Sequence, residues 1–258
     1  MMQTLVSLWF WAATSSIIIV GSILLIPVFL LTVLFDKRRY LSGRFWRNMA
    51  VLCVALNPYW KFKVAKPVPP YRPRKAVVVS NHESNADAFL LSHLPWEMKW
   101  LSKSSLFTIP FFGWCMRMAG DIPLSRGERN STAKAMTLAA KWLEKEMSVM
   151  VFPEGTRSPN GTMLPFKDGA FRLAIEHGAD VLPIAVGGTR EAVPKGTWKL
   201  SSVEALVKVG EPISTAGMTM DDVESLKIEA RRRIQALREE LAAMRGVSLL
   251  DPAESPSA

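Results

Sequence analysis

The chain has 258 residues, of which 32 are Lys or Arg and 23 are Asp or Glu, giving a formal net charge of +9. The composition, 49% apolar and 21% charged, excludes a disordered chain and suits one domain with a sizeable core. Two cysteines and three histidines exclude a disulfide framework, a cysteine-rich metal site and a zinc cluster built from histidines alone.

The first predicted element is a long apolar helix over residues 5–35. No basic residue precedes the run, and it is about twice the length of the apolar region of a signal peptide, which disfavours a cleavable signal. A helix of this length measures about 46 Å, whereas the hydrocarbon core of a bilayer is about 30 Å thick. Pro27 interrupts the run and offers a kink. We therefore predict a membrane-associated helix that is longer than a simple span requires.

A basic segment, defined here as residues 36–75, follows this helix. It holds eleven Lys or Arg against one acid, Asp36, whereas residues 1–35 hold no charge. Nucleic-acid binding would place such an excess on the folded domain, so its position beside an apolar helix favours anionic lipid headgroups instead. We expect the membrane surface to be a partner of this segment, and nucleic acid not to be one.

The basic segment also contains a second apolar stretch, residues 48–60, which predicts a helix that ends at Asn57. Thirteen uncharged residues are too few to cross a bilayer, so an interfacial or re-entrant helix is favoured. Two arrangements remain open. The helices form a hairpin within one leaflet, or the first helix spans the membrane with Met1 outside and the basic segment inside.

From residue 75 onward, short β-rich runs alternate with helical patterns, which predicts an α/β domain with a mostly parallel sheet flanked by helices. We expect membrane-anchoring helices with basic charge over 1–65, the α/β domain over 66–250 and a disordered tail over 251–258. A proline-rich stretch at 66–73 predicts a stiff linker. The predicted strands are 76–80, 98–101, 148–152, 181–186 and 203–209, and the predicted helices are 86–94, 104–118, 130–146, 167–177 and 221–245.

The segment NHESNAD, residues 81–87, follows the first of these strands, where ligands of open α/β sheets bind. His82 and Asp87 would meet if His82 lay in the loop and Asp87 in the first helical turn. The carboxylate would then hold one ring nitrogen while the other acts as a base. Taken alone, the pattern leaves open a helix-capping Asp87 beside an incidental His82.

Cationic side chains follow other strands. The segment FPEGTRS, residues 152–158, can present backbone N–H groups, a hydroxyl and the Arg157 guanidinium to one anion, although an ordinary polar turn would look the same. Arg126 ends the loop GDIPLSR, and Lys103 follows the strand at 98–101. Three cations at strand ends favour an anionic substrate.

These segments resemble, in order and spacing, the four sequence blocks of the glycerolipid acyltransferase family, best those of 1-acyl-glycerol-3-phosphate acyltransferases. Residues 81–87 match the NHxxxxD block and residues 152–158 the FPEGTRS block, while residues 120–126 and 181–185 resemble the second and fourth blocks. The resemblance covers about residues 76–190. Pro123 stands where the family more often carries an aromatic residue.

The resemblance implies transfer of a fatty acyl chain from coenzyme A or acyl carrier protein to the sn-2 hydroxyl of 1-acyl-glycerol-3-phosphate, giving phosphatidic acid. In this interpretation His82 is the general base, Asp87 fixes its tautomer, and the acceptor attacks the thioester directly. No metal or other cofactor is implied. The enzyme would lie at the cytoplasmic side of the inner membrane.

The same resemblance assigns the acceptor's binding residues. Its phosphate would be held by Arg157 with Lys103 and Arg126, the turn would be shaped by Gly155 and Thr156, and Glu154 would position the acceptor or the turn. Acylation of glycerol-3-phosphate, acylation of a lyso-aminolipid such as lyso-ornithine lipid, and a non-catalytic lipid-binding role remain alternatives. A serine hydrolase is disfavoured because the sequence has no GxSxG motif.

Overall fold

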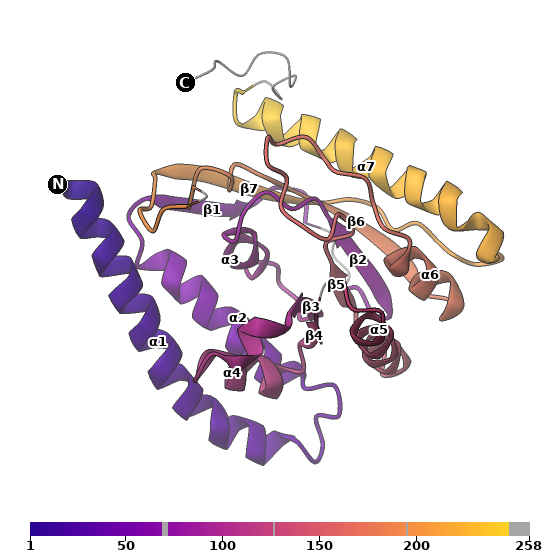
Figure 1. Cartoon of the computed structure of the whole chain (residues 1–258), viewed down its shortest axis with the longest axis horizontal. Coiled ribbons are helices and arrows are strands. Elements are labelled where there is room, and N and C mark those ends of the chain that lie inside the picture. Colours follow the sequence, from indigo (N-terminus) through magenta and orange to yellow (C-terminus); the bar gives the residue numbers. More distant parts are fainter. Residues whose placement is uncertain (69–71, 126, 195, 248–258) are drawn as a thin grey trace.

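The computed structural model describes residues 1–68, 72–125, 127–194 and 196–247, which form a sheet with helices on both faces (Figure 1). The strands are β1 (Trp60–Val64), β2 (Ala76–Ser80), β3 (Lys99–Lys103), β4 (Ile122–Leu124), β5 (Val149–Val151), β6 (Asp180–Gly187) and β7 (Val203–Val209). The helices are α1 (Met2–Thr32), α2 (Tyr40–Ala55), α3 (Asp87–Leu91), α4 (Phe112–Ala119), α5 (Arg129–Glu144), α6 (Gly169–Glu176) and α7 (Val223–Met244), with 3-10 helices η1 (Ser104–Thr108) and η2 (Met220–Asp222). The tail predicted at 251–258 lies outside the described residues.

The strands lie in the order β1-β7-β6-β2-β5-β3-β4. Neighbouring strands are parallel, except that β6 and β7 are antiparallel. The predicted α/β fold with a mostly parallel sheet is therefore confirmed. Because β2, β3, β5 and β6 run in the same direction, their carboxyl ends lie at one edge of the sheet, the edge where such folds bind ligands.

Both faces of the central strands are buried. In β2, Val77 and Val79 face the layer of α5, α6 and α7, whereas Ala76 and Val78 face the α3 side. This alternation places successive side chains in two separate cores. It also explains why the strand is a continuous apolar run, as is usual in parallel sheets covered on both sides.

Two strands differ from the prediction. β1 has the sequence WKFKV, which alternates buried and exposed residues as an edge strand should, but the sequence pattern predicts no strand between the helix that ends at Asn57 and the linker that begins at residue 66. It pairs with β7, so the proline-rich stretch at 66–73 joins two strands of the same sheet. The other unpredicted strand, β4, has three residues and contains Pro123, which fits its place at the sheet's opposite edge.

The single helix predicted at 104–118 is wrong. The structure has η1 and then α4, separated by residues 109–111. Pro110 disfavours helical geometry at Ile109, and Phe111 takes a left-handed conformation with φ of 62°. The chain therefore changes direction here, and α4 packs against α1 and α2.

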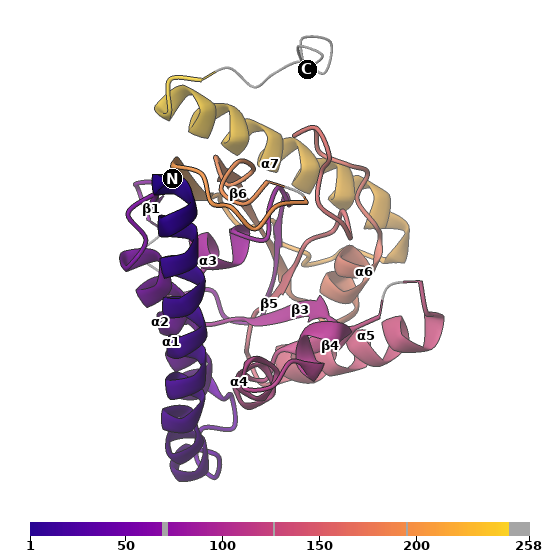
Figure 2. The same cartoon turned by 60° about the vertical axis from the view of Figure 1, so that its left-hand side comes forward.

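The helices α1 and α2 pack side by side along the α/β domain (Figures 1 and 2). Within the described residues, α1 is the one helix long and apolar enough to cross a membrane, which indicates membrane association. It continues through Pro27, which therefore does not end the helix. The rest of α1 keeps its own backbone hydrogen bonds, which is why one missing N–H does not end the helix.

The first turns of α1 are attached to the α/β domain. Gln3 donates to the carbonyl of Leu200 (3.0 Å), and the Leu200 N–H donates to Ser7 Oγ (2.9 Å). Phe10 is buried, with its ring centroid 4.8 Å from that of Trp60 in β1. The start of the long helix is therefore part of the same packed unit as the sheet.

The basic segment does not form one continuous surface. Lys61 and Lys63 are exposed on β1, and Lys63 pairs with Glu204. Arg47 is 6% exposed and pairs with the buried Asp121 beyond α4. The expectation that this segment meets the membrane surface is therefore wrong for Arg47, because its position on α2 faces the sheet.

Candidate active site

The carboxyl end of β2 carries a histidine–aspartate pair. His82 lies in the loop after β2 and Asp87 is the first residue of α3, and His82 Nδ1 is 2.8 Å from Asp87 Oδ2. A carboxylate can only accept, so Nδ1 carries the proton and Nε2 is left as an acceptor. The His82 ring also stacks on Phe152, with centroids 4.0 Å apart. The ring is therefore fixed in tautomer and orientation.

Asp87 is itself held from several sides. Its Oδ2 accepts hydrogen bonds from the backbone N–H groups of Glu83 (2.8 Å) and Ser84 (3.0 Å), and its Oδ1 accepts one from the Thr189 hydroxyl. The side chain is fully buried. These bonds leave the carboxylate little freedom to turn away from His82, so the orientation of the pair is built into the loop.

Glu154 joins this loop to the one after β5. Its Oε1 accepts from the His82 N–H (2.8 Å), and its Oε2 accepts from the Leu164 N–H (2.8 Å). Burial raises the pKa of the Glu154 carboxyl, while the two N–H donors oppose that rise. The observed contacts of Glu154 are thus with the two loops, and they hold the backbone of His82 against the following turn.

The Gly155-Thr156-Arg157 turn lies beside His82, because the next residue, Ser158, donates its N–H to the His82 carbonyl (2.9 Å). Gly155 has φ of 70°, and a Cβ there would come within 2.8 Å of Lys167 Nζ, so glycine fits both the backbone and the space. Thr156 is exposed and Arg157 is half-buried.

The remaining predicted cations are Lys103 and Arg126, of which the structure describes Lys103. Lys103 ends β3, two strands from β2 at the same sheet edge, and its side chain is exposed. Arg126 lies outside the described residues. The structure thus brings together His82, Asp87, Glu154 and the 155–157 turn, and it places Lys103 along the same edge without a contact to them in the described part of the chain.

Comparison with known proteins places this geometry in a family. Residues 61–187 match the family described as Acyltransferase. A 1-acyl-sn-glycerol-3-phosphate acyltransferase of Chlamydomonas reinhardtii is 38% identical over 169 residues, 64% of this chain and 50% of the relative. One from Haemophilus influenzae is 32% identical over 196 residues, 72% of this chain and 80% of that relative. The chain belongs to the acyltransferase family.

A solved structure agrees with this assignment. The 1-acyl-sn-glycerophosphate acyltransferase PlsC of Thermotoga maritima superposes with a TM-score of 0.75 at 26% identity, covering 93% of this chain and 96% of that one. The chain spans about half the length of the algal and plant relatives that it matches.

The structure of this family member adds site residues that the sequence does not predict. Thr189 follows β6 and bonds Asp87, and Asn81 exchanges two hydrogen bonds with the backbone of Val186 (2.9 and 3.0 Å). Both contacts join the histidine loop to β6 or to the residues just after it, which lie about a hundred positions further along the chain. The sequence offers one signal for Thr189, which is its position shortly after the block at residues 181–185, where a strand ends.

An apolar cavity of about 110 Å³ opens between α3 and the α1–α2 pair. Its wall includes Ala88 and Phe89, which directly follow Asp87, together with Met49 and Cys53 of α2. Arg47 and Asp121 lie in its lining as an ion pair. The cavity is therefore mostly apolar, and one side of it is formed by α3, the helix that begins with Asp87.

Proposed function

We propose that this acyltransferase transfers a fatty acyl chain from a thioester to the sn-2 hydroxyl of 1-acyl-glycerol-3-phosphate, giving phosphatidic acid. The donor would be acyl-coenzyme A or acyl carrier protein. The observation that carries the proposal is the oriented His82–Asp87 pair, joined through Ser158 and Glu154 to the turn that bears Arg157. The proposal needs no metal or other cofactor.

The geometry supports a direct transfer. Nε2 of His82 takes the proton of the acceptor hydroxyl as its oxygen attacks the thioester carbonyl, and Asp87 stabilises the imidazolium that forms. The tetrahedral intermediate then releases the thiolate, which takes the proton back from His82. One ester bond forms, one thioester bond breaks, and the enzyme returns to its starting state.

The acceptor's two ends would be bound in different ways. We assign the phosphate to Arg157, with Lys103 and Arg126 as further cations, because guanidinium groups bind phosphate in a bidentate manner. Gly155 and Thr156 shape that turn. The cavity lined by Phe89 would accept part of an acyl chain, since its wall is mostly apolar and includes α3, the helix that begins with Asp87.

The site of action would be a membrane surface, at the cytoplasmic side of the inner membrane and in contact with anionic lipids. The contacts of Gln3, Ser7 and Phe10 with the α/β domain support the hairpin in one leaflet. A spanning α1 would carry these residues to the far side of the bilayer and break all of those contacts.

An acceptor comparison tests the proposed reaction. Purified protein with labelled acyl thioester should acylate 1-acyl-glycerol-3-phosphate faster than phosphate-free monoacylglycerol. Arg157→Lys keeps the charge but loses the bidentate fork, so the acceptor KM should rise by about tenfold while the donor KM is unchanged.

The same assay separates the alternatives. Equal rates with and without the acceptor phosphate would contradict the phosphate assignment, and faster acylation of lyso-ornithine lipid would favour a lyso-aminolipid as substrate. Rapid acylation of glycerol-3-phosphate would point to the earlier step of glycerolipid synthesis. Absence of thioester consumption with every acceptor would leave only lipid binding.

The hairpin is tested by labelling single cysteines in a Cys53→Ser, Cys115→Ser background. Met2→Cys probes the start of α1, and Glu176→Cys, exposed on α6, reports the side of the catalytic domain. With a membrane-impermeant maleimide on spheroplasts, the hairpin predicts that both variants are labelled only after lysis. Labelling of the Met2→Cys variant before lysis, and of the Glu176→Cys variant only after it, would establish a span.

A further inference from the structure

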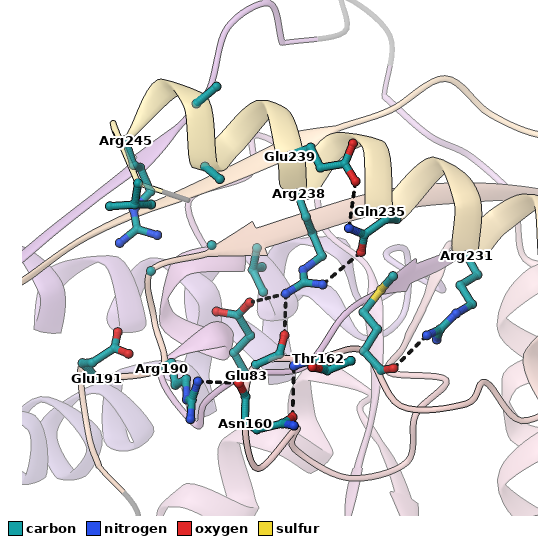
Figure 3. Close-up of a pocket in the computed structure, with 18 residues that line it drawn as sticks. Glu83, Asn160, Thr162, Arg190, Glu191, Arg231, Gln235, Arg238, Glu239 and Arg245 are labelled. Atoms are coloured by element: carbon teal, nitrogen blue, oxygen red, sulfur yellow. Dashed lines mark hydrogen bonds and ion pairs between the residues drawn. The ribbon is translucent and has the colours of Figure 1, made fainter. Parts of the chain in front are cut away.

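Arg238, on α7, contacts two loops of the candidate site at once. Its Nη2 donates to the carbonyl of Gly161 (2.5 Å) and lies 3.6 Å from Glu83 Oε1, while its Nη1 donates to Gln235 (3.1 Å) (Figure 3). The residue is 7% exposed, at the base of a hollow between α7 and the loops after β5 and β6. A buried guanidinium that donates to one loop and lies within ion-pair distance of another restrains their separation.

The loop that contains Glu83 is also the loop that contains His82 and leads into Asp87. Glu83 follows His82 directly, donates its own N–H to Asp87, and accepts a hydrogen bond from Asn81 (3.2 Å). Burial and the neighbouring Asp87 raise the pKa of Glu83 to about 8, and Arg238 and Arg245 oppose this rise while Glu191 adds to it. A shift of Glu83 would therefore move the backbone that orients Asp87.

The second loop is the one that follows Arg157. The Gly161 N–H donates to Ser158 Oγ (2.9 Å), and that hydroxyl donates to the Thr162 carbonyl (2.7 Å). Gly161 is thus bound to the residue next to Arg157. Because Arg238 holds the Gly161 carbonyl, it acts on the Arg157 turn through one short, hydrogen-bonded link.

Two other arginines hold the same loop but not the histidine loop. Arg231 donates to the carbonyls of Met163 and Leu164, and Arg190 donates to those of Pro159 and Asn160. Of the three, over the described residues, Arg238 is the one within ion-pair distance of Glu83. Arg238 thus adds a side-chain bridge to the direct hydrogen bonds that Glu154 and Ser158 make with the His82 backbone.

We propose that Arg238 is a positioning residue for acyl transfer, which bridges the His82 loop and the Arg157 loop and, together with Glu154 and Ser158, sets the distance between the base and the phosphate-binding cation. The inference rests on the proposed function. In the acceptor, hydroxyl and phosphate are carried on neighbouring glycerol carbons, so both must be met by protein groups at a fixed spacing. A misplacement of about 1 Å in such a site can lower the rate by about 100-fold.

The test compares Arg238→Gln with Arg232→Gln, an exposed arginine of the same helix that pairs with Glu229. The measured quantity is the ratio of kcat/KM for 1-acyl-glycerol-3-phosphate to that for monoacylglycerol. The ratio should fall at least about tenfold in Arg238→Gln, because only the phosphorylated acceptor needs both loops in register. It should be unchanged in Arg232→Gln.

A purely structural role predicts a different result. Loss of folded enzyme lowers both activities equally and leaves the ratio intact, and that outcome would overturn the proposal. Arg238→Lys keeps the charge but cannot span both partners, so it should restore the melting temperature without restoring the ratio. Should Arg238→Gln not fold, Arg238→Lys and Glu83→Ala, which removes the partner of Arg238 on the histidine loop, give the same comparison in folded protein, and an unchanged ratio in both would reject the bridge.

Different results would contradict the proposed function and the positioning role of Arg238. If wild-type protein does not prefer the phosphorylated acceptor, the proposed function is wrong and the bridge has no role. If wild type shows the preference and Arg238→Gln keeps it, the function stands and the positioning role of Arg238 is rejected.

Discussion

Replacing His82 with alanine should lower acyl transfer at least about 100-fold, because a positioned general base contributes about 10²–10⁴-fold to the rate. Asp87→Asn should also be severe, since an amide at Oδ2 no longer accepts reliably from Nδ1 and the wrong tautomer forms. Initial rates with labelled acyl thioester and 1-acyl-glycerol-3-phosphate measure both effects. Membrane association should be unaffected, because His82 lies in a loop at the sheet edge and not on the apolar helix α1.

The matched control is His177→Ala, at the end of α6, which contacts no residue of the candidate site in the described structure. It should retain wild-type rates. A His82→Ala enzyme that kept more than about a tenth of wild-type activity would be inconsistent with a general base at this position.

The second large effect concerns stability. Asp121→Asn should lower the free energy of unfolding by about 3–5 kcal/mol, because it removes the nearer of the two buried carboxylates that face Arg47 and leaves only Glu97, 3.7 Å from Arg47 Nε. Asp121 Oδ1 accepts from both Arg47 and the backbone N–H of Trp100, so one oxygen joins α2 to the sheet. Denaturant titration of detergent-solubilised protein gives the value, and Asp221→Asn, exposed before α7, is the control expected to change it little.

The size of this effect depends on the whole buried cluster. Glu97 and Lys99 complete it, with Lys99 donating to the carbonyl of Ala119 (2.8 Å) and to that of Arg39 (3.0 Å). Burial raises the pKa of Glu97 and lowers that of Lys99, so uncompensated charge is disfavoured here. Two cations and two anions balance, and removal of one anion leaves a net charge inside. Wild-type stability in Asp121→Asn would mean that the cluster tolerates imbalance.

The parts of the site that are local can be predicted from the sequence. His82 and Asp87 are five positions apart with a helix start between them, so the loop geometry that joins them is decided within one short segment. The alternating strand and helix patterns likewise predict the parallel sheet. These features depend on neighbours along the chain, and a single sequence contains such patterns.

The features that the sequence does not predict depend on distant partners. Thr189 reaches Asp87 across 102 positions, and Arg47 meets Asp121 across 74, so no local pattern marks either pair. Charge composition groups Arg47 with the surface cations, because it does not reveal which cation has a buried acid opposite it. The strand β1 is not predicted because it also depends on a distant partner. This five-residue edge strand is stabilised by pairing with β7.

The attachment of α1 to Leu200 constrains the order in which the protein assembles. Gln3 and Leu200 are 197 positions apart, so the first turn of the first helix docks on a segment synthesised near the end of the chain. β1 must also wait for β7, its sheet partner. Contacts of such separation form late, because closing a long loop precedes the stabilisation it brings. The apolar helix α1 therefore lacks these contacts until Leu200 and β7 have been synthesised.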